Sequence, residues 1–223
     1  MEKMPYQELA GEDTVVSTPP LVVPSPEVKN DWRSGLPALA GTQVTLRELR
    51  ASDATSLFLA LANDEATRFI SPPPSTIEGF ERFIAWALRQ RIAGQYVCFA
   101  VVPRGSDTAL GLFQIRSLEP AFGAAEWGFA LAPELWGTGF FSDGAQLAIR
   151  FAFDTLGAHR LEARASVRNG RGNAALRKLG ALREGTLRNS FLRNGEYHDQ
   201  ALWTILADEW RTGHVSGEPP VIH

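Results

Sequence analysis

Residues 126–142 read EWGFALAPELWGTGFFS and contain three local patterns in succession. The alternating apolar run at their start predicts a strand, which Pro133 closes. A glycine loop at residues 136–139 follows, and from Phe140 to Leu156 apolar residues recur at the spacing of one helix face. A strand, a glycine loop and a helix predict an anion site, because loop N–H groups and a helix N-terminus both attract phosphate. The alternative interpretation is a tight turn before a helix.

The composition predicts a globular protein with a sizeable core. The chain has 223 residues, of which 44% are hydrophobic, and a formal net charge of −3. Its one cysteine, Cys98, excludes an internal disulfide framework and lies in an apolar run, which predicts a core thiol rather than a nucleophile. The four histidines lack the spacing of metal ligands, so no metal is expected. We found no apolar run of about 18 residues and no secretion signal, and therefore expect a cytoplasmic protein that does not contact membranes.

Charge is unevenly distributed along the chain. Nine of the 22 Lys and Arg residues lie within residues 159–193, beside only two acids, Glu162 and Glu184. The remainder is net acidic. This polarity predicts an anion-facing region and a second region that favours a cationic amine near the reaction centre. For any single arginine, the alternative is a solvated surface position.

The chain divides into three predicted parts. Residues 1–40 hold six prolines without a sustained period and predict a flexible or extended lead-in. Residues 41–210 predict one α+β domain, and residues 211–223 a C-terminal tail. Within the domain, the patterns predict a strand, two helices, three strands, the glycine-loop helix, a strand, a short helix and two strands. The second helix begins at a predicted capping box, Ser75–Glu78. This order predicts a mixed sheet of about seven strands flanked by helices.

Several segments in this order resemble the GNAT superfamily of acyl-CoA-dependent N-acyltransferases, and within it the RimJ/RimL type that acetylates protein N-termini. The resemblance covers roughly residues 44–206. It implies a mostly antiparallel sheet with a splayed central strand pair. The segments that carry it are VTLREL (44–49), AEWGF (125–129), WGTGF (136–140), LGAHRLEAR (156–164), NGRGNAALRKLGA (169–181), REG (183–185) and NGEYHD (194–199).

The resemblance implies acetyl-CoA as co-substrate and assigns three groups of residues to it. The thioester oxygen would accept a backbone N–H near Phe129 on a free strand edge. Phe141 departs from the family pattern, which has a small residue there, and the loop carries no basic side chain. The implied ligands are Trp136, Gly137, Thr138, Gly139, Phe140, Phe141 and Ser142 for the pyrophosphate, Phe129, Ala130, Leu131 and Asn169 for the pantetheine arm, and Asn173 and Arg177 for the adenosine or its phosphate.

Glu126 matches the glutamate of the family's strand motif and is the implied general base, acting directly or through a water. Since an α-amino group has a pKa near ~7.7, the base needs only modest strength. A salt-bridged strand glutamate is the alternative. Leu176 stands where many members carry a tyrosine, so Tyr197, a water or no dedicated acid stay open for the leaving thiolate.

The implied activity is direct transfer of an acetyl group from acetyl-CoA to a primary amine, with a protein N-terminal α-amino group as one acceptor. A small-molecule acceptor such as a polyamine or antibiotic, and an acyl-CoA-binding module without catalysis, are alternatives. An oxidoreductase is disfavoured because three consecutive strands precede the loop, unlike the alternation of a dinucleotide-binding domain. We expect no nucleic-acid binding, and a monomer or homodimer.

Overall fold

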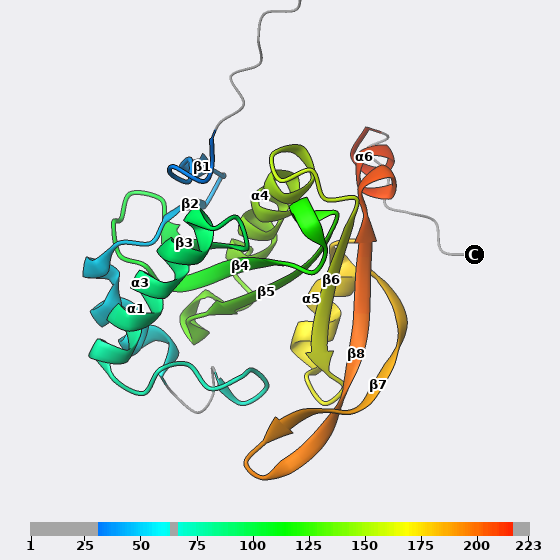
Figure 1. The fold of residues 1–223 in the computed structure, drawn as a ribbon. Coiled ribbons are helices and arrows are strands. Elements are labelled where there is room, and N and C mark those ends of the chain that lie inside the picture. The colour runs from blue at the N-terminus through cyan, green and yellow to red at the C-terminus, as the bar shows by residue number, and fades with distance from the viewer. Residues whose placement is uncertain (1–30, 63–66, 216–223) are drawn as a thin grey trace, which may run out of the picture.

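The computed structural model describes residues 31–62 and 67–215. Within them, eight strands form one sheet in the order β1-β2-β3-β4-β5-β6-β8-β7 (Figure 1). Neighbouring strands are antiparallel except β5 and β6, which are parallel. The strands are β1 (Leu39–Ala40), β2 (Val44–Glu48), β3 (Tyr96–Pro103), β4 (Gly111–Ser117), β5 (Ala124–Leu131), β6 (Arg160–Ser166), β7 (Leu182–Arg193) and β8 (Glu196–Leu206).

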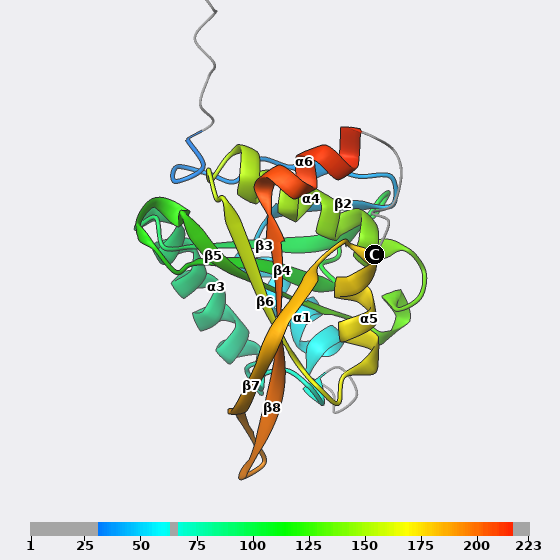
Figure 2. The same cartoon turned by 90° about the vertical axis from the view of Figure 1, so that its right-hand side faces the viewer.

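Helices cover the two faces of the sheet unequally. On one face, α1 and α3 cover only the half of the sheet that contains β2–β5, so the β6–β8 half stays open (Figure 1). On the other face lie α4, α5 and α6, and the β7–β8 hairpin projects beyond the rest (Figure 2). The helices are α1 (Ala54–Leu61), α3 (Ile77–Ile92), α4 (Phe140–Asp154), α5 (Gly170–Lys178) and α6 (Ala207–Val215), with short 3-10 turns η1 (Ala51–Asp53), η2 (Pro120–Phe122) and η3 (Pro133–Leu135).

Aromatic packing fixes α4 on the sheet. The rings of Phe99 in β3 and Phe151 in α4 meet edge to face, with centroids 5.0 Å apart. Phe113 in β4 is fully buried, and the centroid of its ring lies 6.1 Å from the ring centroid of Phe141 in α4. Cys98 is 4% exposed in β3, and burial raises the pKa of its thiol to about 12. The predicted core thiol is therefore confirmed.

The central strand pair is splayed, as predicted. β5 and β6 pair at only three positions, from Ala124 opposite Arg160 to Glu126 opposite Glu162. Beyond that point β5 continues to Leu131 and β6 to Ser166, but the two no longer pair. Their facing edges consequently carry backbone N–H and C=O groups that are open to a ligand.

Packed elements extend past both predicted ends of the domain. The described residues form eight strands, in agreement with the predicted sheet of about seven, and the additional strand is Leu39–Ala40, which lies inside the predicted lead-in and pairs with β2. Trp32 also packs edge-on against Phe122, with centroids 5.5 Å apart. At the other end, α6 extends from Ala207 to Val215 and so crosses the predicted boundary at residue 210. Trp210 packs against Phe153 of α4 and holds this helix on the domain. Residues 1–30 of the lead-in and 216–223 of the tail lie outside the described residues.

A local signal placed the start of α3 within one residue. The N-cap of α3 is Thr76, whose hydroxyl accepts from the Gly79 N–H at 3.0 Å, and not Ser75 as the predicted capping box required. In the described residues, no helix is both long enough and apolar enough to cross a membrane.

Candidate active site

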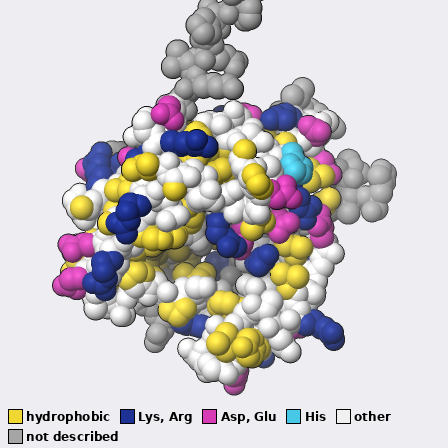
Figure 3. All heavy atoms as spheres, viewed as in Figure 1, with side chains coloured by type: hydrophobic (Ala, Val, Ile, Leu, Met, Phe, Trp, Pro, Cys, Tyr) yellow, Lys and Arg dark blue, Asp and Glu magenta, His cyan; other side chains and the backbone are white. Residues whose placement is uncertain are grey.

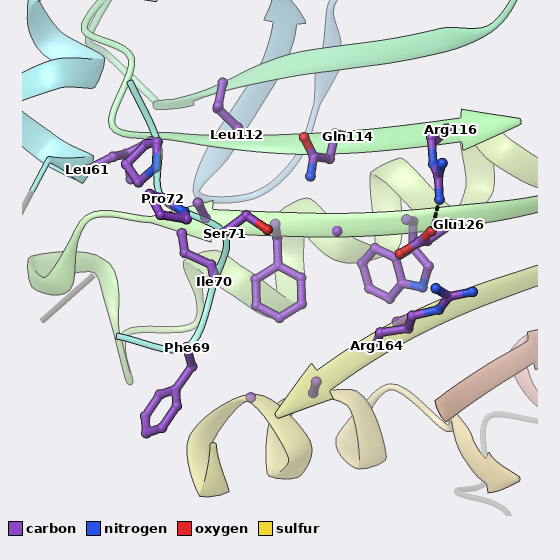
Figure 4. A pocket seen from close by; sticks show the side chains of 18 of the residues that line it. Leu61, Phe69, Ile70, Ser71, Pro72, Leu112, Gln114, Arg116, Glu126 and Arg164 are labelled. Atoms are coloured by element: carbon purple, nitrogen blue, oxygen red, sulfur yellow. Dashed lines mark hydrogen bonds and ion pairs between the residues drawn. The ribbon is translucent and has the colours of Figure 1, made fainter. Parts of the chain in front are cut away.

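A cavity of about 530 Å³ opens in the gap between β5 and β6. The space-filling view shows the hollow near the middle of this face, with Lys and Arg side chains beside it (Figure 3). Of the predicted site residues, Glu126, Phe129, Ala130 and Asn169 line it. One end of the cavity is apolar, near Leu61, and the other is charged, around Glu126 (Figure 4).

Side chains alternate along β5, so this strand faces two different environments. Phe129 points toward α4, where its ring lies 4.4 Å from that of Phe141. Glu126 points to the opposite face, beside Arg116 of β4. The strand therefore separates an α4 side, on which the glycine loop lies, from the side covered by α1 and α3.

The backbone of β5 alternates in the same way. The Ala124 carbonyl accepts from Leu118 at 2.9 Å and the Ala132 N–H donates to Leu110 at 2.8 Å, both on the β4 side. The Gly123 carbonyl accepts from His159 at 2.9 Å, on the β6 side. Since successive residues point their polar groups to opposite edges, the N–H of Phe129 faces the gap and that of Ala130 faces β4. Phe129 is thus the better placed of the two to polarise a carbonyl.

The glycine loop has the properties of an anion cradle. Gly137 and Gly139 adopt φ angles of +77° and +92°, which L side chains rarely adopt. In the described part of the chain, the backbone N–H groups of residues 137–142 have no hydrogen-bond acceptor. They lie at the N-terminus of α4, whose dipole favours an anion. These residues fit the pyrophosphate of acetyl-CoA.

The side chains of Thr138 and Phe141 make their contacts outside that cradle. The Thr138 hydroxyl donates to the Leu135 carbonyl at 2.6 Å. The bulky Phe141 packs against Phe129, so its departure from the family pattern does not fill the loop. Ser142 is exposed in the first turn of α4.

Asp143, also in the first turn of α4, anchors the loop to the start of β2. Its carboxylate accepts from the N–H groups of Thr42 at 3.0 Å, Gln43 at 2.7 Å and Val44 at 3.0 Å, and from the Thr42 hydroxyl at 3.1 Å. Burial pushes the pKa of Asp143 upward, but these four hydrogen bonds outweigh it and hold the pKa below its ordinary value.

Trp136 links the loop to both sides of the gap. Its indole N–H donates to the Leu131 carbonyl at the end of β5, at 3.1 Å. The guanidinium of Arg171, from α5, lies over its ring at 3.8 Å from the centroid. The sequence gave Arg171 no role, although it lies within the resembling segment 169–181. It brings to the loop the cationic side chain that the loop itself lacks.

The three predicted ligands near α5 are divided between two cavities. Asn169 lines the first, and its side-chain oxygen caps α5 by accepting from Gly172 at 2.8 Å. Asn173 and Arg177 instead line a second cavity of about 420 Å³. The amide of Asn173 donates to the carbonyls of Ser166 and Asn169, at 2.8 and 2.7 Å, and accepts from Trp203 at 2.8 Å. Its observed contacts thus join α5 to β6 and β8, and its cofactor contact stays a prediction.

Glu126 is held by an ion pair. The Arg116 guanidinium, on the adjacent strand, donates to its carboxylate, and the Glu126 side chain is 23% exposed. Arg164 of β6 approaches from the other side of the gap (Figure 4). Neither arginine was found from the sequence, because their place beside Glu126 depends on the β4–β5 register and on the splay.

Of the options for protonating the leaving thiolate, Tyr197 is poorly placed. It is 63% exposed near the tip of the β7–β8 hairpin and does not line the cavity. Leu176, at the family's tyrosine position, is 1% exposed and lines the cavity with an apolar side chain.

Comparisons with known proteins agree with this geometry. The family description "Acetyltransferase (GNAT) domain" matches residues 43–182. The uncharacterised N-acetyltransferase YoaA of Bacillus subtilis (strain 168) is 28% identical over 175 residues, which are 76% of this chain and 97% of that protein. The "Putative ribosomal N-acetyltransferase YdaF" of the same organism is 26% identical over 174 residues, covering 75% and 93%. A spermidine N(1)-acetyltransferase of Vibrio cholerae is 26% identical over 110 residues, which are 49% of this chain and 64% of that protein.

Solved structures have the same fold. A GCN5-related N-acetyltransferase from Brucella melitensis is 26% identical with a TM-score of 0.68, covering 78% of this chain and 80% of that one. Mycobacterium smegmatis RimJ in complex with CoA-disulfide is 20% identical with a TM-score of 0.70, and the match covers 78% of this chain and 89% of that one. The fold, the gap in its sheet and the family match lead to one conclusion: this chain belongs to the GNAT family of acetyltransferases.

Proposed function

We propose that the protein is an acetyl-CoA-dependent N-acetyltransferase that acts on the α-amino group of peptide or protein N-termini. The cavity along β5 is the observation that supports this proposal most strongly. On one side of this strand lies the glycine loop, and on the other side Glu126 points into the cavity. Acetyl-CoA would supply an acetyl thioester. The N–H groups of residues 137–142 would bind its pyrophosphate, assisted by Arg171, and the edge of β5 would bind its pantetheine arm.

Two groups of the protein would assist the transfer itself, a backbone N–H and a carboxylate. The Phe129 N–H would hydrogen-bond the thioester carbonyl, on which negative charge develops as the amine attacks. Glu126 would accept the amine proton, directly or through a water. The ion pair with Arg116 orients its carboxylate. The buried Cys98 thiol, with its raised pKa, is unsuited to a covalent intermediate, which supports direct transfer.

A protein acceptor is supported by one comparison: the chain is similar over most of its length to the "Putative ribosomal N-acetyltransferase YdaF". The resemblance of its motifs to the RimJ/RimL type points to the N-terminus of the acceptor protein. The similarity to a spermidine acetyltransferase extends over only about half of the chain, which leaves a small-amine acceptor as the second candidate.

The test is an acetyl-CoA turnover screen. Peptides with a free N-terminus, the same peptides with a blocked N-terminus, spermidine and an aminoglycoside would each be incubated with the protein and acetyl-CoA. We expect thiol release and a mass gain of one acetyl group only with free N-termini. In calorimetry, acetyl-CoA should bind more tightly than acetyl-pantetheine, which lacks the pyrophosphate. Acetyl-CoA binding without turnover on any amine would indicate a binding module, and no binding would refute the proposal.

A further inference from the structure

The charged end of the cavity is built from three side chains. Among the described residues that line it, Arg116, Glu126 and Arg164 are the charged ones. They converge at one end of the cavity, whereas the other end is lined by apolar side chains such as Leu61, Ile70 and Leu112 (Figure 4). The cavity therefore has a charged end and an apolar end.

The negative charge at this end is already balanced within the protein. The carboxylate of Glu126 pairs with Arg116, its cross-strand neighbour. That leaves Arg164 as the third charge, and its guanidinium makes no hydrogen bond or ion pair with any described residue.

Two acids on the same side of the gap as Arg164, Glu162 and Glu184, already have partners among the described residues. Glu162, two residues before it on the same face of β6, is bound to Arg160 at 3.0 Å. Arg160 also pairs with Glu184 of β7 at 2.6 Å, and together with the Thr204 hydroxyl it lowers the pKa of Glu184 to about 2. Both carboxylates are therefore committed to Arg160. Arg164 is left as a cation that faces the cavity without a counter-ion in the described residues.

This charge balance differs from the one expected from the sequence. The net acidic character of the chain outside residues 159–193 predicted a cationic amine at the reaction centre. The charges that line the cavity in the described residues are instead two guanidinium groups and one carboxylate. A polyamine would bring a second ammonium group close to Arg164, and like charges repel.

We propose that the natural acceptor is an amine that carries a carboxylate close to its reacting nitrogen and an apolar group beyond it. The carboxylate pairs with Arg164, and the apolar group occupies the end of the cavity near Leu61. Arg164 is thus a specificity residue for the acceptor, and this inference rests on the proposed function. The carboxylate has two possible sources, an acidic side chain near a peptide N-terminus and the α-carboxylate of an amino acid.

Matched acceptors test the proposal and separate these sources. The peptides Ala-Asp-Phe-amide and Ala-Asn-Phe-amide are nearly isosteric and differ in the charge of one side chain, and Ala-Lys-Phe-amide places a longer, cationic side chain at that position. Phenylalanine differs from its amide only in the α-carboxylate. We expect kcat/KM to be about tenfold higher for the acidic member of at least one pair, which is the effect of one charge-assisted hydrogen bond. Spermidine should be the poorest acceptor. The preference should shrink as salt is raised, since the site is open to solvent.

Variants assign the preference to Arg164. Arg164→Gln should bring the ratio of acidic to neutral acceptor close to one, and Arg164→Glu should invert it. Arg89→Gln, which removes the same charge from an exposed position on α3, should leave the ratio unchanged. Acetyl-CoA binding by calorimetry checks that each variant is folded and holds its donor.

The outcomes distinguish the two proposals. Turnover that favours spermidine or the lysine peptide, or an acidic preference that persists in Arg164→Gln, overturns this inference while the acetyltransferase activity stands. The absence of turnover with every amine overturns the proposed function and this inference with it.

Discussion

Glu126 combines a structural ion pair and a proposed catalytic role in one carboxylate. The sequence identified this residue because it opens a recognisable motif, EWGF. Its partner Arg116 is ten positions away in the chain and is brought beside it by the register of β4 against β5. Arg164 and Arg171 escaped prediction for the same reason. Each is one arginine among many in a basic segment, and its role follows from what it faces in the folded chain.

The role of Glu126 as a base makes a prediction about pH. Glu126→Gln should lower kcat about 10²–10⁴-fold, the usual contribution of general base catalysis. The loss should diminish between pH 6 and 9, because a growing share of the amine is already neutral. Acetyl-CoA affinity should change little, since the contacts proposed between acetyl-CoA and β5 lie beyond Glu126.

The measurement is kcat/KM across this pH range for the wild type and the variant on the same amine. Glu81→Gln, at an exposed position of α3, is the matched control. A loss that is the same at every pH, accompanied by a lower melting temperature, would mean that Glu126 serves only as the partner of Arg116.

At the scale of elements, the periodic patterns predicted every long strand and helix of the domain. The two elements that the patterns missed have little periodicity to detect. β1 has only two residues, too few for an alternation. α6 is mostly polar and is held through Trp210, whose burial depends on a contact with α4. The splay between β5 and β6 followed from the resemblance, since neither strand shows in its own sequence where pairing stops.

The Asp143 anchor predicts an acid-sensitive link between α4 and β2. Asp143→Asn exchanges an ionised acceptor of four hydrogen bonds for a neutral one, and should lower the free energy of unfolding by about 2 kcal/mol near neutral pH. Because the pKa of Asp143 is lowered in the folded protein, its contribution is complete above the ordinary aspartate pKa of ~3.9. The contribution is lost as pH falls through the lowered folded-state value.

Denaturant unfolding from pH 3 to 8 measures this effect. The difference between wild type and Asp143→Asn should be constant above about pH 5 and narrow below about pH 4. Asp154→Asn, in the same helix but in an exposed pair with Arg211 at 3.6 Å, should change stability by less than ~0.5 kcal/mol. An equal loss in both variants would show that the anchor contributes no more than a surface ion pair.

For the whole molecule, the described part of the predicted lead-in belongs to the packed domain. Residues 39 and 40 pair with β2, and the Arg91 guanidinium donates to the Trp32 carbonyl at 3.2 Å. The proline-rich composition of residues 1–40 concealed these contacts, because composition averages a short packed segment with its neighbours. The predicted boundary at residue 40 therefore cuts through elements that hold the edge of the sheet.

A truncation series tests this boundary. A chain that begins at Gly41 lacks β1 and Trp32 and leaves β2 as an open edge, so we expect it to melt about 4–8 °C below a chain that begins at Asp31. That range corresponds to a loss of about 2 kcal/mol in a domain of this size. Calorimetry on both chains, with light scattering to detect edge-to-edge aggregation, makes the comparison. Equal melting temperatures would place the start of the stable domain at residue 41.

The alternation of β5 has a consequence for how such an enzyme changes over generations. Odd-numbered positions such as Phe129 point to the α4 side, where we propose that the donor binds, and even-numbered positions such as Glu126 point to the side proposed for the acceptor. Inserting or deleting a single residue in this strand would exchange the two sets and destroy both sites at once. The segments that line the apolar end of the cavity, such as residues 69–74, are under no such constraint. New acceptors can therefore arise by drift in those segments while the donor chemistry is inherited unchanged.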